Sequence, residues 1–278
     1  MAVYKYRFDS IDELVSALDA PLANARNSSD IIAGAHNTRW ACAHRETSCI
    51  ADTQRHLAAQ TFPEGVALVA ELTQKLDAPT PVNRRRRPVR APEGDELDIG
   101  RVWDGDLEHA WRNTRREQSV GPSRVLVAVQ INAPAYVQAS TLAWRGATAL
   151  AYTSALLEAG FVVELIACTR NTLLDAENST YSADVTLLGA GEQLDVHKLA
   201  SLTASGLLFR GVILQHENVV SLRRLSVGTS TGKGPLTASQ LDTAGFDYVA
   251  VVGENQHDRL TAQSWLQLNI AALDMHQH

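Results

Sequence analysis

Two apolar runs separated by a long alanine-rich segment constrain the fold of this 278-residue chain most strongly. Residues 124–131, RVLVAVQI, and residues 161–168, FVVELIAC, are nearly continuous in apolar side chains, as is typical of strands covered on both faces. Residues 139–159 carry small and apolar side chains at helical spacing, and Gly160 marks the end of that helix. This strand–helix–strand succession predicts a right-handed crossover between two parallel strands.

The same alternation continues to the C-terminal end of the sequence. Residues 182–190 and 246–253 read as strands, while residues 195–205, 237–245 and 261–273 read as helices. Residues 206–215, GLLFRGVILQ, fit either a strand or a buried helix. The alternation predicts an α/β fold with a doubly wound, largely parallel sheet.

The N-terminal part has a weaker and more mixed pattern. A strand at 4–8, a capped helix at 11–20, a second helix at 66–76 and a polar helix at 107–118 are expected, the last ended by Gly121 and Pro122. Trp103 and Trp111 are expected to be buried anchors. We therefore predict two domains: residues 1–122, a smaller mixed α+β region with an arginine-rich connector, and residues 123–278, the α/β domain.

Composition limits the cellular setting. The first residues do not form the apolar core of a signal peptide, and no run of about 18 apolar residues follows, so neither secretion nor membrane spanning is indicated. Three cysteines are too few for a disulfide framework, which favours reduced thiols and a cytoplasmic location. The net charge of −6 argues against a surface that binds nucleic acid throughout.

The segment from the first apolar run through the second, residues 125–168, resembles the opening strand, helix and strand of von Willebrand factor A-type domains. The resemblance is to the chelatase-like subunits that work with AAA+ ATPases, and it implies a von Willebrand A/Rossmann-like sheet. Such domains carry an Asp-x-Ser-x-Ser motif after the first strand, where oxygen atoms ligate a divalent cation. Here the matching loop is Gln130-Ile131-Asn132-Ala133-Pro134. It contains no acid and no hydroxyl, so we predict that no metal binds there.

The resemblance and the expected topology place a partner-binding face at one edge of the sheet. Open α/β sheets bind ligands and partners beyond the carboxyl ends of their strands. The residues expected on this face are Gln130, Asn132, Ser140, Thr169 and Glu254.

The whole chain also resembles a group of uncharacterised phage and prophage proteins. The resemblance rests on FPEGVALVAEL at 62–72 and on GDELDIGRVWDGDLEHAW at 94–111. It implies a mobile-element origin, with a virion or replication accessory role.

Arginines concentrate in one stretch. Residues 84–116 hold nine of the 25 basic residues, including Arg84, Arg85, Arg86, Arg87 and Arg90. Such clusters attract phosphates, and Trp103 and Trp111 offer stacking surfaces for bases. Seven acidic residues are interleaved with them, so a self-paired, solvated face is the other interpretation.

Motifs for catalysis and cofactors are absent from the sequence. His36, Cys42, His44, Cys49 and His56 lack the regular spacing of a zinc site. The loop 228–234, GTSTGKG, lacks both the first glycine of a phosphate-binding loop and the hydroxyl after its lysine. His197, His216 and His257 are isolated candidates for acid–base groups. We expect no catalytic residue and no cofactor.

These observations favour a non-enzymatic protein-binding, adaptor or assembly protein whose partner is an AAA+ ATPase or a virion component. The alternative is a nucleic-acid-binding accessory protein that acts through residues 84–116. A hydrolase or transferase with an unrecognised site ranks last.

Overall fold

The computed structural model describes most of the chain. The described residues are 3–22, 62–76, 79, 89–94, 96–113, 123–133, 137–173, 179–204, 213, 216, 229–230 and 236–276. They divide into two compact units, residues 1–80 with 124–278 and residues 81–123. The expected boundary at 122 and 123 lies next to one of the two divisions. The N-terminal strand and helices, however, belong to the same unit as the C-terminal strands.

The larger unit contains one sheet with strands in the order β1-β7-β6-β5-β9. The five strands are β1 (Val3–Phe8), β5 (Arg124–Gln130), β6 (Val162–Leu173), β7 (Thr180–Leu188) and β9 (Tyr248–Val252). Strand β5 is parallel to both β6 and β9, and β1 is parallel to β7. The β6–β7 pair is antiparallel, and the short β8 (Thr229–Ser230) also pairs antiparallel with β6. The fold is therefore α/β with a mostly parallel sheet, as the sequence predicts at this level.

The third predicted strand runs in the opposite direction to β6. Strand β6 extends through the polar residues 169–172 to Leu173, and β7 begins at Thr180, so only residues 174–179 join them. A parallel connection needs a crossover of about a dozen residues or more, and this link is too short for one.

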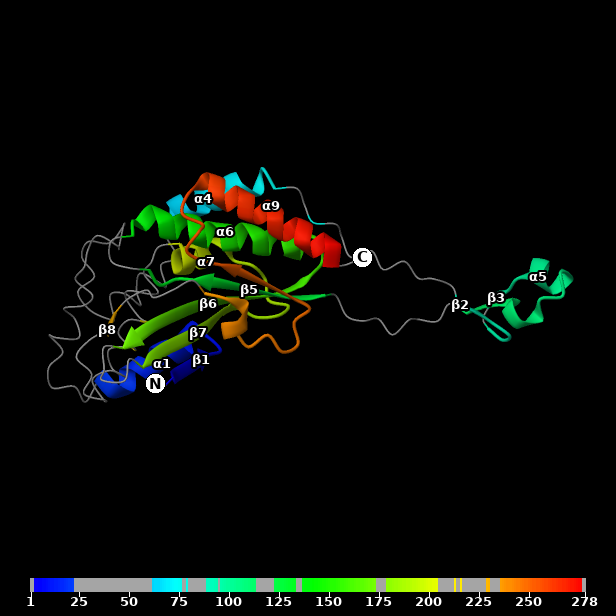
Figure 1. Ribbon diagram of the computed structural model, residues 1–278, viewed down its shortest axis with the longest axis horizontal. Coiled ribbons are helices and arrows are strands. Elements are labelled where there is room, and N and C mark those ends of the chain that lie inside the picture. The colour runs from blue at the N-terminus through cyan, green and yellow to red at the C-terminus, as the bar shows by residue number, and fades with distance from the viewer. Residues whose placement is uncertain are drawn as a thin grey trace. The chain divides into compact units, whose positions relative to one another are not determined.

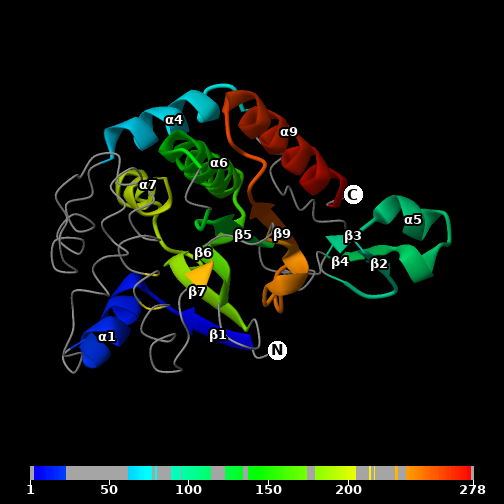
Figure 2. The same cartoon turned by 60° about the vertical axis from the view of Figure 1, so that its left-hand side comes forward.

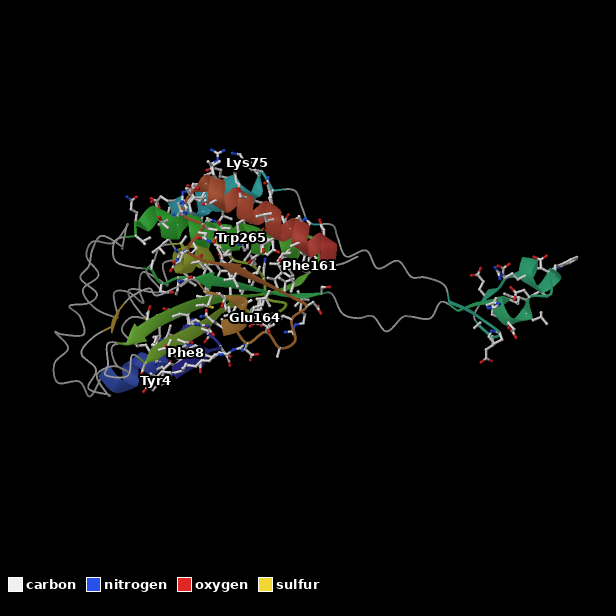
Figure 3. The ribbon with its side chains drawn as sticks, viewed as in Figure 1. Tyr4, Phe8, Lys75, Phe161, Glu164 and Trp265 are labelled. Atoms are coloured by element: carbon white, nitrogen blue, oxygen red, sulfur yellow. The ribbon has the colours of Figure 1, made fainter. Side chains whose placement is uncertain are left out.

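Helices cover the sheet on the side of β5 where Val125, Val127 and Val129 point. They are α4 (Pro63–Thr73), α6 (Ala139–Glu158), α7 (Val196–Thr203) and α9 (Arg259–His276). Figure 1 shows α4, α6 and α9 together above the sheet, and Figure 2 shows α4 and α9 outside α6. Helix α1 (Ile11–Leu22) follows β1 and buries Leu14. Trp265 of α9, labelled in Figure 3, meets Tyr152 of α6 edge to face, with ring centroids 5.2 Å apart.

The other face of β5 and β6 is covered by the segment before β9. Leu236 and Leu241 pack on Leu126, Ala128 and Ile166 of the two strands. Residues 237–245 form the 3₁₀ helix η3 (Ala238–Gln240) and turns, so the helix predicted over that whole range is wrong. The capping-box contacts of Thr237 and Gln240 satisfy backbone N–H groups at the start of this one-turn helix.

The smaller unit contains the three-stranded order β2-β4-β3. Its elements are β2 (Val89–Ala91), β3 (Glu96–Leu97), α5 (Ile99–Trp103), η1 (Leu107–His109) and β4 (Trp111–Asn113). The polar helix predicted at 107–118 is wrong over its described part, because Trp111 pairs with Ala91 and Leu97 across the sheet. Trp103, expected as a buried anchor between the two halves, is not buried within its own unit, where it is 85% exposed.

Helix α6 approaches α7 so closely that Gly146 has no room for a side chain. A Cβ at this position would lie 2.5 Å from the backbone nitrogen of Ala204 and 2.5 Å from the carbonyl carbon of Thr203. Both neighbours are backbone atoms, so neither can rotate away.

We predict that Gly146→Ala lowers the free energy of unfolding by about 2 kcal/mol, because overpacking against backbone forces the helices apart. The loss exceeds the helix-propensity gain of about 1 kcal/mol that alanine normally brings. Urea unfolding followed by circular dichroism checks this, with Ser154→Ala on the same helix as the control. Stabilisation by Gly146→Ala would contradict the close contact.

Candidate functional site

The carboxyl ends of β5, β6 and β9 lie at one edge of the sheet, because β5 is parallel to both neighbours. Gln130, the last residue of β5, connects the elements at this edge. Its Nε2 donates to Oε1 of Glu254 at 3.3 Å, and its Oε1 accepts from the backbone nitrogen of Leu236 at 3.0 Å. The structure thus joins the end of β5, the residues after β9 and the segment that covers the sheet.

Asn132 follows β5, and Thr169 lies within β6 next to Cys168, the partner of Gln130; both residues are fully buried. The amide nitrogen of Asn132 donates to the carbonyl of Arg170 at 2.9 Å and to Oδ1 of Asn171 at 3.1 Å. Oδ1 of Asn132 and Oγ1 of Thr169 have no hydrogen-bond partner among the described residues. Four of the five residues expected on the partner face therefore come together.

Ser140, the fifth expected residue, lies apart from this buried cluster. It is exposed in the first turn of α6, and its hydroxyl lies 3.5 Å from Oε1 of Gln138. Asn255, His257 and Leu260, which follow β9, are also exposed. Ser140 and these three residues are among the exposed positions in the segments that follow β5 and β9.

Arg145 is the central residue of the site, and sequence analysis missed it. The residue is 2% exposed, and its Nη1 donates to the carbonyls of Gln130 at 2.9 Å and Asn132 at 3.0 Å. Burial lowers the pKa of Arg145 to about 10, while the charge of Glu254 opposes that shift. The side chain therefore stays cationic at neutral pH. The sequence signal for Arg145 was a charged side chain at the spacing of the helix's apolar face, between Leu142 and Ala149.

The strand end does not fit a divalent cation. The residues that replace the Asp-x-Ser-x-Ser motif offer amides and backbone carbonyls, and two of those carbonyls already accept from Arg145. A metal ion beside this buried guanidinium would face a like charge with little solvent to screen it. Within the described residues, no group of three or more His, Cys, Asp or Glu side chains is placed to hold a metal.

The isolated histidines do not form a shared acid–base site. His216 is buried among Tyr6, Phe8 and Tyr181, and its Nδ1 lies 2.8 Å from the Tyr181 hydroxyl. His257 is exposed beside Asp258, and His197 lies on α7. These positions belong to different elements, so each histidine has a local role.

A second polar region lies on the face covered by Leu236 and Leu241. It surrounds a cavity of about 80 Å³. Arg7 contacts Glu164 at 3.4 Å and Asp242 at 3.6 Å, and Arg170 pairs with the buried Asp184 at 2.6 Å. Opposite charges compensate one another here, so the pairs hold β1, β6 and β7 to the covering segment.

Several sequence candidates fall outside the described residues. Arg84 to Arg87 and the set from His36 to His56 are among them, and only residues 229–230 of the 228–234 loop are described. Arg90 belongs to β2. Among the described residues, no helix has the length and apolar character needed to cross a membrane.

Comparison with known proteins assigns this chain to a family. The model for a domain of unknown function, DUF7192, matches residues 2–238, which is most of the chain. The chain belongs to the DUF7192 family. No curated protein and no solved structure matches it. The DUF7192 match ends before β9 and α9, although β9 pairs with β5 in the sheet. Its description carries no activity, no phage origin and no von Willebrand A-like domain.

We predict that Arg145→Met lowers the free energy of unfolding by about 2 kcal/mol. The change leaves the buried carbonyls of Gln130 and Asn132 without their donor, and orphaned polar groups cost about 1–3 kcal/mol each, partly offset by removal of a buried charge. Chemical denaturation measures the effect. Arg259→Met, at a half-exposed arginine on α9 that pairs with Glu71, is the control and should cost less than about 1 kcal/mol. Equal losses in the two variants would contradict the structural role of Arg145.

Proposed function

We propose that this DUF7192 member is a non-enzymatic protein-binding module, an adaptor or assembly protein, built on a von Willebrand A-like domain that works without a metal ion. The observation that carries the proposal is the Arg145 guanidinium, which fills the strand end with fixed hydrogen bonds to main-chain carbonyls. Because these hydrogen bonds hold the end of β5 in one arrangement, the exposed residues around it present a fixed surface. The site offers that surface to a partner and no activated group to a substrate.

The β5–α6–β6 unit supports the von Willebrand A-like part of the proposal. Its two strands are parallel, and α6 packs on both of them, in the succession that the resemblance implies. The buried residues Gln130, Asn132 and Thr169, with the half-buried Glu254, hold the loops in place, and the exposed Ser140 makes the contact. The resemblances noted in the sequence suggest an AAA+ ATPase or a phage virion component as the partner, in the cytoplasm of the cell or of an infected host.

Site-specific crosslinking tests this face. The full chain would carry the photoreactive p-benzoylphenylalanine at Ser140, at the start of α6, or at Glu158, the exposed last residue of the same helix. We expect a protein adduct from position 140 in a lysate of the cell of origin, and none from position 158. The adduct should persist after nuclease treatment and after chelation of divalent ions. Equal adducts at both positions, or none at 140, would contradict the proposal.

The alternative function is nucleic-acid binding through residues 84–116. The concentration of nine arginines in this stretch favours it. In the described part, Arg101 pairs with Asp106, which removes one arginine from phosphate binding. Replacing Arg84 to Arg87 by serine should abolish a salt-dependent mobility shift of a DNA or RNA oligonucleotide. If the unmodified chain produces no shift at low salt, the alternative fails.

A further inference from the structure

The smaller unit exposes the apolar side chains that a folded unit normally buries. Among its described side chains, Ala110 is the buried apolar one. Ile99, Val102 and Trp103 of α5 and Leu107 of η1 are exposed, with Trp103 at 85%, Ile99 at 63% and Leu107 at 61%. Residues 81–123 contain no cysteine, so no disulfide compensates for the missing core. Units this small usually need such a link, a metal or a bound partner.

The four exposed residues Ile99, Val102, Trp103 and Leu107 form what we call the α5 patch. Ile99 lies three residues before Val102 and four before Trp103, so these three share one side of the helix. Asp106 then fixes the turn into η1, because its carboxylate pairs with Arg101 and lies 2.9 Å from Nδ1 of His109. Hydrogen bonds to His109 and the nearby positive charges lower the pKa of Asp106. The patch is therefore displayed on a turn held by polar contacts.

Exposed carboxylates accompany the α5 patch. Asp104 and Glu108 are exposed next to Trp103 and Leu107 in the chain. Arg101, by contrast, is engaged by Asp106, and Glu96 lies opposite Arg112 across the β3–β4 pair. Phosphate groups of a nucleic acid would be repelled here, so base stacking on Trp103 is disfavoured. Two such patches would also repel each other, which disfavours contact between the same surfaces of two copies. A surface of opposite charge is the complement.

We propose that the α5 patch docks into an apolar groove of a partner protein, and that lysine and arginine side chains line the rim of that groove. Tryptophan is enriched among the residues that dominate the affinity of protein interfaces, and a shell of polar contacts around it excludes water. The acidic rim adds attraction to the basic groove and excludes acidic partners. This inference rests on the proposed protein-binding function and names the chemistry of a second contact, separate from the strand end.

The experiment uses the full chain with p-benzoylphenylalanine at Trp103, or at the exposed Glu93 of the same unit as a control, in nuclease-treated lysate of the cell of origin. We expect a protein adduct at position 103 that is absent at position 93. The crosslinked partner is then produced and its affinity for the unmodified chain measured by isothermal titration calorimetry. Its crosslinked segment should be apolar with flanking Lys or Arg, and its affinity should fall as salt rises.

Matched variants decide whether the α5 patch carries that affinity. Trp103→Ala and Ile99→Ser should each weaken binding about tenfold or more. Leu268→Ala, at an exposed leucine of α9, should leave it unchanged. Circular dichroism verifies that each variant is folded. Unchanged affinity of Trp103→Ala, equal adducts at 93 and 103, or an adduct with nucleic acid or with a second copy of this chain would overturn the inference.

The outcomes at the two faces separate this inference from the proposed function. A protein adduct at Ser140 without one at Trp103 would overturn the docking role of the α5 patch and leave the strand-end function standing. Adducts at Trp103 alone, lost in Ile99→Ser, would support the patch and count against the strand-end face. Protein adducts at neither position would overturn both.

Discussion

A buried guanidinium at the end of a central strand is the interaction on which the strand-end site depends. Arg145 reaches from α6 to the carbonyls of Gln130, the last residue of β5, and of Asn132, which follows it. The Arg145 guanidinium thus holds α6 to the end of β5. The side chains of Gln130 and Asn132 connect that end to Glu254, after β9, and to Asn171 of β6. Burying a charge is costly, which lowers the pKa of Arg145, and Glu254 offsets part of that cost.

The two units differ in how completely they bury their apolar side chains. The larger unit covers both faces of its sheet, with helices on one side and the segment around η3 on the other. The smaller unit has three short strands and leaves the apolar side chains of α5 and η1 exposed. Packing within the larger unit accounts for the burial of its apolar side chains without a partner. The second unit is explained only if something else covers Trp103 and its neighbours.

Sequence patterns predicted the elements whose side chains are buried on both sides. Strands β5 and β6 and helix α6 are examples, because their apolar runs are long and continuous. The direction of β7 was not predicted, because the polar residues 169–172 do not look like a continuation of β6 and so conceal how short the connection is. The pairing of β1 with β7 joins residues more than 170 positions apart, which no local pattern encodes. Four expected site residues came together because parallel strands end at one edge, whereas Arg145 was read as part of an apolar helix face.

The most direct test of a strand end closed by a guanidinium is titration of the full chain with Mn²⁺, followed by electron paramagnetic resonance. The account predicts that the chain binds no Mn²⁺ tightly at this edge, because Arg145 already supplies the positive charge and the loop offers no carboxylate or hydroxyl. One Mn²⁺ per chain, removed by a chelator and lost in Asn132→Ala, would contradict it.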